Sequence, residues 1–158
     1  MSASERSDRI TFVVGAVLLA MYVAQGVIGL EWQALARLQQ NEIYKVISGC
    51  VLACYLLYQW LVARRRVVDP VGALFWHKLA GAFAPAVVYL HASELGYGYL
   101  LLISVAFVVT TGLGLLHRPV LRIHARPLYT WWFILHVATS SSLLVLGGYH
   151  VVIALAYE

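Results

Sequence analysis

Four histidines lie within two strongly apolar stretches of this chain, and their spacing is what could support chemistry. The stretch HKLAGAFAPAVVYLH carries His77 and His91, and the later stretch HVATSSSLLVLGGYH carries His136 and His150, again fourteen positions apart. In an α-helix, fourteen residues rise roughly 21 Å and end about 40° short of four full turns. Each stretch is therefore predicted to present two imidazoles on nearly the same side of one helix, at two depths.

Imidazoles at matched depths on two neighbouring helices suit haem iron, which binds neutral nitrogen ligands on its two open faces. We predict two haem b groups, one between His77 and His136 and the other between His91 and His150. A zinc site fits less well, because zinc ligands converge on one point. The plainer alternative is that these histidines only pack or hydrogen-bond between membrane helices. Ionisable residues inside spans are rare, however, and usually functional.

The composition predicts that a membrane positions these histidines. Of 158 residues, 62% are hydrophobic and 11% are charged, whereas soluble domains carry about 25% charged residues. A helix needs about 20 apolar residues to cross the hydrocarbon core. We expect one all-α domain, an integral membrane bundle of five transmembrane helices. The expected spans cover about residues 10–30, 43–63, 71–92, 97–116 and 128–156.

The ends of these spans carry recognisable signals. The first apolar run is longer than that of a signal peptide, so we expect a retained anchor. The polar connection after it is expected to form an interfacial helical turn, with Trp32, Leu35 and Leu38 on the membrane side. Pro70 suits the start of a helix. The sequence SELGYG predicts a tight turn between the third and fourth spans.

The basic residues predict the orientation of the bundle. With the N-terminus inside, the outer side holds only Arg37 and Lys45. This asymmetry is the one expected for membrane proteins with basic inner loops, and an odd number of spans then leaves the C-terminus outside. The net charge of +4 is thus interpreted as a topology signal and not as a nucleic-acid surface. The inner side holds Arg6, Arg9, Arg64, Arg65, Arg66, Arg118, Arg122 and Arg126.

Several residues near the histidines have two possible roles. Basic side chains at the inner side could pair with the propionates of the inner haem or anchor lipid headgroups; they are Lys78, Arg118, Arg122 and Arg126. The run from Thr139 to Ser142 is expected to bond back to its own helix more readily than to an imidazole. Gly81, Gly147 and Gly148 would leave room either for a flat macrocycle or for ordinary helix packing. His117 and His124 are expected to be solvated.

On these residues the chain resembles the ferric reductase-like transmembrane domain family. That family includes eukaryotic metalloreductases, NADPH oxidases and a bacterial methionine sulfoxide reductase membrane subunit. The resemblance implies two haems b, held by paired histidines on the third and fifth spans near the two membrane faces. His77 and His91 match the third-span pair, and His136 and His150 match the fifth-span pair.

The resemblance covers about residues 70–156 and includes the connection HRPVLRIHARPLYTWWFILH. The chain departs from the family in having five expected spans where six are usual, and no flavin or nicotinamide module is seen. Quinol-oxidising cytochrome b subunits share the same histidine spacing, and YLHASELGYGYL is similar to their outer turn. Both families remain open at this point.

Two haems stacked across a bilayer would pass single electrons between its faces, with the protein tuning their potentials. We therefore expect a transmembrane electron-transfer cytochrome b that passes electrons from the inner to the outer face and lies in lipid, in the bacterial inner membrane. Its partner would be a soluble or membrane redox protein or a quinone, not a nucleic acid. There are three alternatives. The chain could be an oxidoreductase membrane subunit that needs such a partner, a haem-bearing anchor of a larger redox complex, or a haem-free helical scaffold or transporter.

Overall fold

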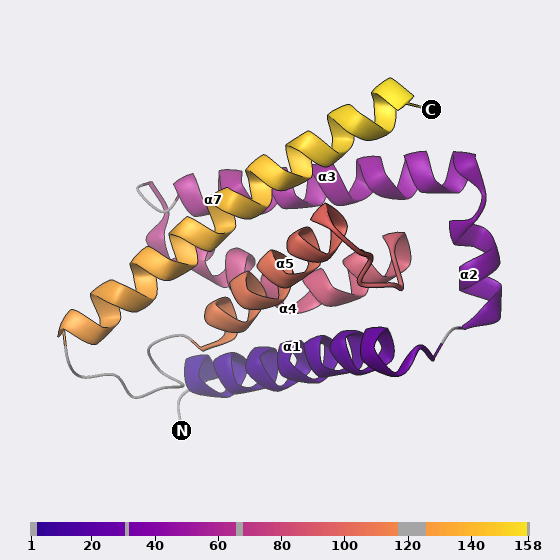
Figure 1. The fold of residues 1–158 in the computed structure, drawn as a ribbon. Helices are drawn as coiled ribbons and strands as arrows, with labels where there is room; N and C mark the ends of the chain where they lie inside the picture. The colour runs from indigo at the N-terminus through magenta and orange to yellow at the C-terminus, as the bar shows by residue number, and fades with distance from the viewer. Residues whose placement is uncertain (1–2, 31, 66–67, 117–125, 158) are drawn as a thin grey trace. The chain divides into compact units, whose positions relative to one another are not determined.

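The structure is a computed structural model that describes residues 3–30, 32–65, 68–116 and 126–157. Within these ranges all regular secondary structure is helical (Figure 1), which confirms the all-α prediction. The first helix begins seven residues before the expected residue 10, and all other ends of the long helices lie within two residues of the expected boundaries. The helices are α1 (Ala3–Ile28), α2 (Gln33–Gln39), α3 (Glu42–Arg65), α4 (Pro70–His91), α5 (Tyr99–Leu115) and α7 (Arg126–Tyr157).

Four of these helices are long and apolar enough to cross a membrane. In the most apolar 18-residue segment of each helix, at most 22% of the residues are buried, so most of the apolar side chains there face outward. Outward-facing apolar helices of this length are what a lipid environment requires. The chain therefore has the character of a membrane protein. The four candidate spans are Arg6–Ile28, Glu42–Arg65, Pro70–His91 and Pro127–Tyr157.

Helix α5 occupies the place of the fourth expected span but is shorter than the other four long helices. It has 17 residues, which corresponds to about 26 Å of helix against a hydrocarbon core of about 30 Å. Most of its residues are apolar, and it has no acidic residue in its first turn and no basic residue in its last turn. A crossing by α5, and with it the five-span topology, stays a prediction.

The local start and stop signals act as the sequence suggests. Pro70 is the first residue of α4, and the carboxylate of Asp69 caps that helix by accepting from the Gly72 amide at 2.9 Å. The turn after α4 uses Gly96 and Gly98, whose φ angles are 72° and 60°. A backbone with positive φ costs glycine little, since it has no Cβ. Gly98 is also the residue that precedes the first turn of α5.

The short helix α2 differs in one respect from the expected interfacial turn. Trp32 and Leu38 are 64% and 51% exposed, as membrane-side residues should be, but Leu35 is only 4% exposed. The reason is that α2 lies against α3 and α4, so Leu35 packs inside the protein. The expected outward placement is therefore found for Trp32 and Leu38 and is wrong for Leu35.

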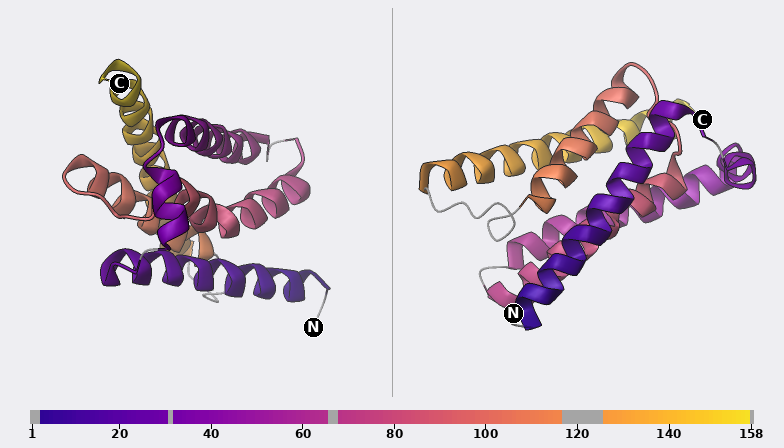
Figure 2. Two further views of the ribbon diagram at one scale, coloured as in Figure 1. Left: turned by 90° about the vertical axis from the view of Figure 1, so that its right-hand side faces the viewer. Right: turned by 90° about the horizontal axis from the view of Figure 1, so that it is seen from below.

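The chain divides into two compact units, residues 1–94 and 95–158. In the first unit α4 packs against both α1 and α3 (Figure 2). The buried residues of α4 are small, namely Ala73, Ala82, Ala84 and Pro85, which lets neighbouring helices approach closely. In the second unit α5 packs against α7. Each unit thus contains one of the two histidine-bearing helices.

Candidate functional site

Both histidine pairs lie on uninterrupted helices. His77 and His91 belong to α4, with His91 as its last residue, and His136 and His150 belong to α7. The helical rise and rotation assumed for the fourteen-residue spacing therefore apply to both pairs. All four imidazoles are partly shielded by their own unit and not fully exposed.

The ring of His91 is positioned by two consecutive residues of α3. Its Nδ1 lies 3.0 Å from the Ser48 hydroxyl. A Cβ on Gly49 would lie 3.2 Å from the ring carbon Cε1, closer than most side-chain contacts. The ring edge therefore rests on the α3 backbone, in a space that only a glycine leaves open.

A group of polar side chains fixes the last turn of α4, which carries His91. The Gln39 amide donates to the carbonyls of Tyr89 and Leu90 at 2.8 and 3.3 Å, and the Tyr44 hydroxyl donates to Leu90 at 2.8 Å. Ser93, which is buried, donates to the Gln39 carbonyl oxygen at 2.7 Å. These bonds satisfy carbonyls that a helix end leaves without intrahelical partners. The position of His91 is thereby set by tertiary contacts.

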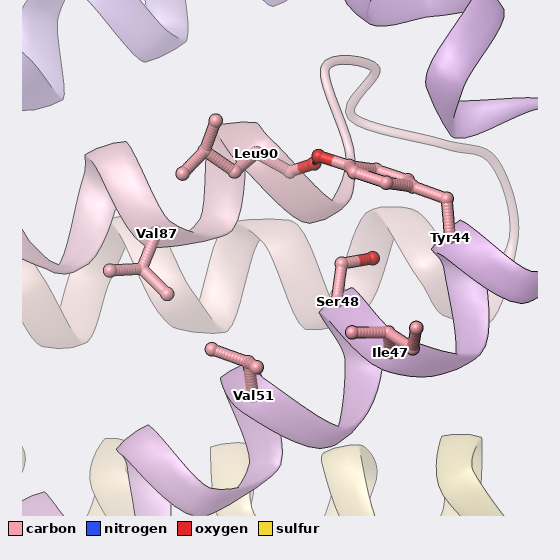
Figure 3. Close-up of a pocket in the computed structure, with 6 residues that line it drawn as sticks. All are labelled: Tyr44, Ile47, Ser48, Val51, Val87 and Leu90. Atoms are coloured by element: carbon pink, nitrogen blue, oxygen red, sulfur yellow. Dashed lines mark hydrogen bonds between the residues drawn. The ribbon is translucent and has the colours of Figure 1, made fainter.

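An open apolar pocket lies beside this turn, between α3 and α4 (Figure 3). Its volume is about 200 Å³. In the close-up, the Tyr44 ring extends from α3 toward Leu90, and Ser48 lies on the same side of α3 below it. The pocket is lined by Tyr44, Ile47, Ser48, Val51, Val87 and Leu90.

In the second unit, His136 is placed between its own helix and α5. Trp132, one turn earlier on α7, stacks on it with ring centroids 5.8 Å apart and planes within 1°. The Trp132 indole donates to the Leu113 carbonyl at 2.8 Å. A Cβ on Gly114 would lie 3.2 Å from Cε1 of His136. As with His91, one edge of the imidazole rests on a glycine of the neighbouring helix.

His150 has a looser environment at the other end of α7. The Tyr99 hydroxyl lies 3.4 Å from its Nδ1, and the two ring centroids are 6.1 Å apart. Gly147 and Gly148 have no atom within 4 Å of an added Cβ, so neither is packed closely against α5, the other described helix of its unit. Gly81 makes only an ordinary contact, with Gln59 at 3.8 Å.

Three of the four Ser and Thr residues between the two histidines of α7 bond back to their own helix, as predicted. Thr139, Ser140 and Ser142 each donate to a carbonyl three or four residues earlier, at 2.6 to 3.2 Å. Ser140 donates to the backbone of His136 and not to its ring. These hydroxyls are therefore satisfied without an imidazole.

Of the basic residues predicted near the inner haem, Lys78 is the one whose side chain the structure describes. Its amino group lies 2.5 Å from the Asp8 carboxylate, and the two side chains are 18% and 24% exposed. This ion pair joins α4 to α1 and gives Lys78 a carboxylate partner inside the first unit. Arg118, Arg122, His117 and His124 lie outside the described residues. Arg126 begins α7, but its side chain also lies outside them.

Sequence reasoning missed the residues that touch the imidazoles, four from neighbouring helices and Trp132 from α7 itself. They are Ser48, Gly49, Tyr99, Gly114 and Trp132. Only Trp132 carries a usable signal, because residues four apart on a helix share a face. The others depend on the register between two helices, which no spacing within one segment reveals.

Within the described ranges, no three side chains of His, Cys, Asp or Glu gather around a point that could hold a metal ion. A haem iron needs fewer ligands from the protein, because the porphyrin supplies its other four nitrogen ligands. Searches of known protein families, curated proteins and solved structures found no match to this chain.

Proposed function

We propose that this protein binds two b-type haems and transfers electrons across a membrane. The observation that carries the proposal is the pair of equally spaced histidines on each of two membrane-length helices, α4 and α7. His77 with His136, and His91 with His150, would be the axial ligands, a pairing taken from the equal spacing in the sequence. Bound haem b supplies a one-electron couple, with a potential tuned by ligands and surroundings.

The residues around the histidines fit such a group. Axial imidazoles need one nitrogen for iron and a partner on the other, which fixes the ring. The Ser48 hydroxyl lies near Nδ1 of His91, and the Tyr99 hydroxyl lies near Nδ1 of His150. In each ring, Nε2 therefore points away from that hydroxyl. Gly49 and Gly114 let His91 and His136 sit close to the neighbouring backbones. The apolar spans would keep water from the bound group.

The proposal includes five spans, with the N-terminus inside and the C-terminus outside, because the basic residues are concentrated on one side. It places the chain in a bacterial inner membrane and gives it a ferric reductase-like role, from the inner to the outer face. A quinone or a redox protein would serve as partner. The support for these finer points is the basic-residue pattern and the family resemblance of residues 70–156.

The direct test is a reduced-minus-oxidised absorption spectrum of the purified protein, with haem counted per chain. We expect b-type bands and two haems per chain. A protein that contains no haem, or one haem per chain, contradicts the proposal. The histidine variants described below then assign each haem to its ligands.

A second measurement separates electron transfer from a role as a haem-bearing anchor. The protein is placed in liposomes with an impermeant reductant on one side and an impermeant acceptor on the other. We expect reduction of the trapped acceptor only when the protein is present. Haem reduction with no transfer to the far side would favour the anchor alternative.

A further inference from the structure

We infer that Ser48 is a positioning residue that holds His91 as the tautomer able to bind iron through Nε2. The inference rests on the proposed function, which makes His91 a haem ligand. It adds a residue from α3, a helix that contributes no ligand histidine, to the outer haem site. The observation behind it is the pair of contacts made by one hydroxyl oxygen.

The Ser48 hydroxyl has one proton and two close partners. Its Oγ lies 3.2 Å from the Lys45 carbonyl oxygen, one turn earlier on α3, and 3.0 Å from Nδ1 of His91. A carbonyl oxygen can only accept, and we assign the Ser48 proton to the Lys45 carbonyl, to which the hydroxyl donates. With that assignment, Nδ1 of His91 carries a hydrogen and donates it to the Ser48 oxygen, 3.0 Å away. A neutral imidazole protonated on Nδ1 keeps its lone pair on Nε2.

The neighbouring residues hold the ring in place for this bond. Gly49 lies under the ring carbon between the two nitrogens, with 3.2 Å between Cε1 and the position of an added Cβ. With Nδ1 directed to Ser48, the geometry of a five-membered ring points Nε2 away from that hydroxyl. The capping bonds from Gln39 and Tyr44 fix the backbone just before His91. One region, the N-terminal half of α3 together with α2, thus sets the ring position, the tautomer and the backbone of His91.

No other hydroxyl that the structure describes near a histidine is arranged in this way. Tyr99 lies 3.4 Å from Nδ1 of His150, which is long for a hydrogen bond to a hydroxyl. Ser140 and Ser142 donate to their own helix backbone and do not reach an imidazole. The inference is therefore specific to Ser48, and Ser142 offers a matched control in a membrane helix.

An acceptor on Nδ1–H raises the basicity of the ligating nitrogen, and loss of such a partner typically weakens metal binding about 10- to 100-fold. We expect Ser48→Ala to weaken retention of one haem about 10-fold or more. The midpoint potential of that haem should rise, because a less basic ligand stabilises ferric iron less. The second haem should keep its potential.

The experiment uses the full-length protein and two independent readouts. Redox titration gives the two midpoint potentials in the native protein, Ser48→Ala, Ser48→Thr and Ser142→Ala. Imidazole ¹⁵N NMR of the dithionite-reduced protein reports which nitrogen of His91 carries hydrogen, with His91 assigned as the signal lost in His91→Ala. We expect Nδ1–H in the native protein and in Ser48→Thr, a weakened or lost Nδ1–H signal in Ser48→Ala, and no change in Ser142→Ala.

Different results would disprove the role of Ser48 and the proposed function. Haem-replete protein whose potentials and Nδ1–H signal are the same in Ser48→Ala overturns the role of Ser48 and leaves the proposed function standing. A native His91 protonated on Nε2 also overturns it. Native protein without haem overturns the proposed function, and the NMR signal still decides whether Ser48 sets the tautomer.

Discussion

The two histidine-bearing helices are positioned by different means. Helix α4 lies between α1 and α3, and its last turn receives hydrogen bonds from Gln39 and Tyr44. Helix α7 has 32 residues and packs against α5, the other described helix of its unit. Hydroxyl side chains of α7 bond to its own backbone. His91 at the end of α4 is therefore held by tertiary contacts to both its ring and its backbone, whereas His150 near the end of α7 has only a long contact with Tyr99.

The largest effect that tests this comparison is the removal of a histidine from each helix. His91→Ala and His150→Ala should each remove one haem of the two, because an axial ligand is lost. His91→Ala should also destabilise the protein by about 1 kcal/mol more than His150→Ala, since it alone breaks a well-formed bond to Ser48. Haem counting and thermal denaturation measure the two effects. Loss of both haems from either variant would refute the assignment of ligands to separate levels.

The next effect concerns the glycine beneath His136. Gly114→Ala puts a Cβ at 3.2 Å from the ring, whereas Gly112→Ala, on the same helix, meets no atom within 4 Å. We expect Gly112→Ala to be neutral or to stabilise by up to about 1 kcal/mol through helix propensity. Gly114→Ala should lose that gain and perturb the spectrum of one haem. Equal behaviour of the two variants would show that the ring does not rest on α5.

A smaller effect should come from the ion pair that joins α1 to α4. Asp8→Asn leaves the Lys78 amino group without its carboxylate. Because both side chains are partly exposed, we expect a loss of about 1 kcal/mol or less. Thermal denaturation measures it, with Asp69→Asn as a control that keeps a cap acceptor on α4. A change in haem content in Asp8→Asn would instead indicate that Lys78 also acts at the inner haem.

The sequence alone predicts the helices of this protein well and the contacts around the histidines poorly. Apolar length and the signals at Pro70 and SELGYG place the long helices within a few residues. The back-bonding of Thr139 and Ser140 is also predictable, because it is local. Ser48 is not, because its role depends on which turn of α3 lies beside the end of α4.

The smallest effect expected is that of Tyr99→Phe, which removes the hydroxyl 3.4 Å from Nδ1 of His150. At this distance the hydrogen bond is weak, and the Phe ring keeps the aromatic contact with Tyr149. We expect a shift in the potential of the outer haem well below that of Ser48→Ala, and no loss of haem. Redox titration of both variants makes the comparison. A shift in Tyr99→Phe as large as in Ser48→Ala would mean that His150 relies on its neighbouring hydroxyl as much as His91 does, and that the contrast between these two histidines is wrong.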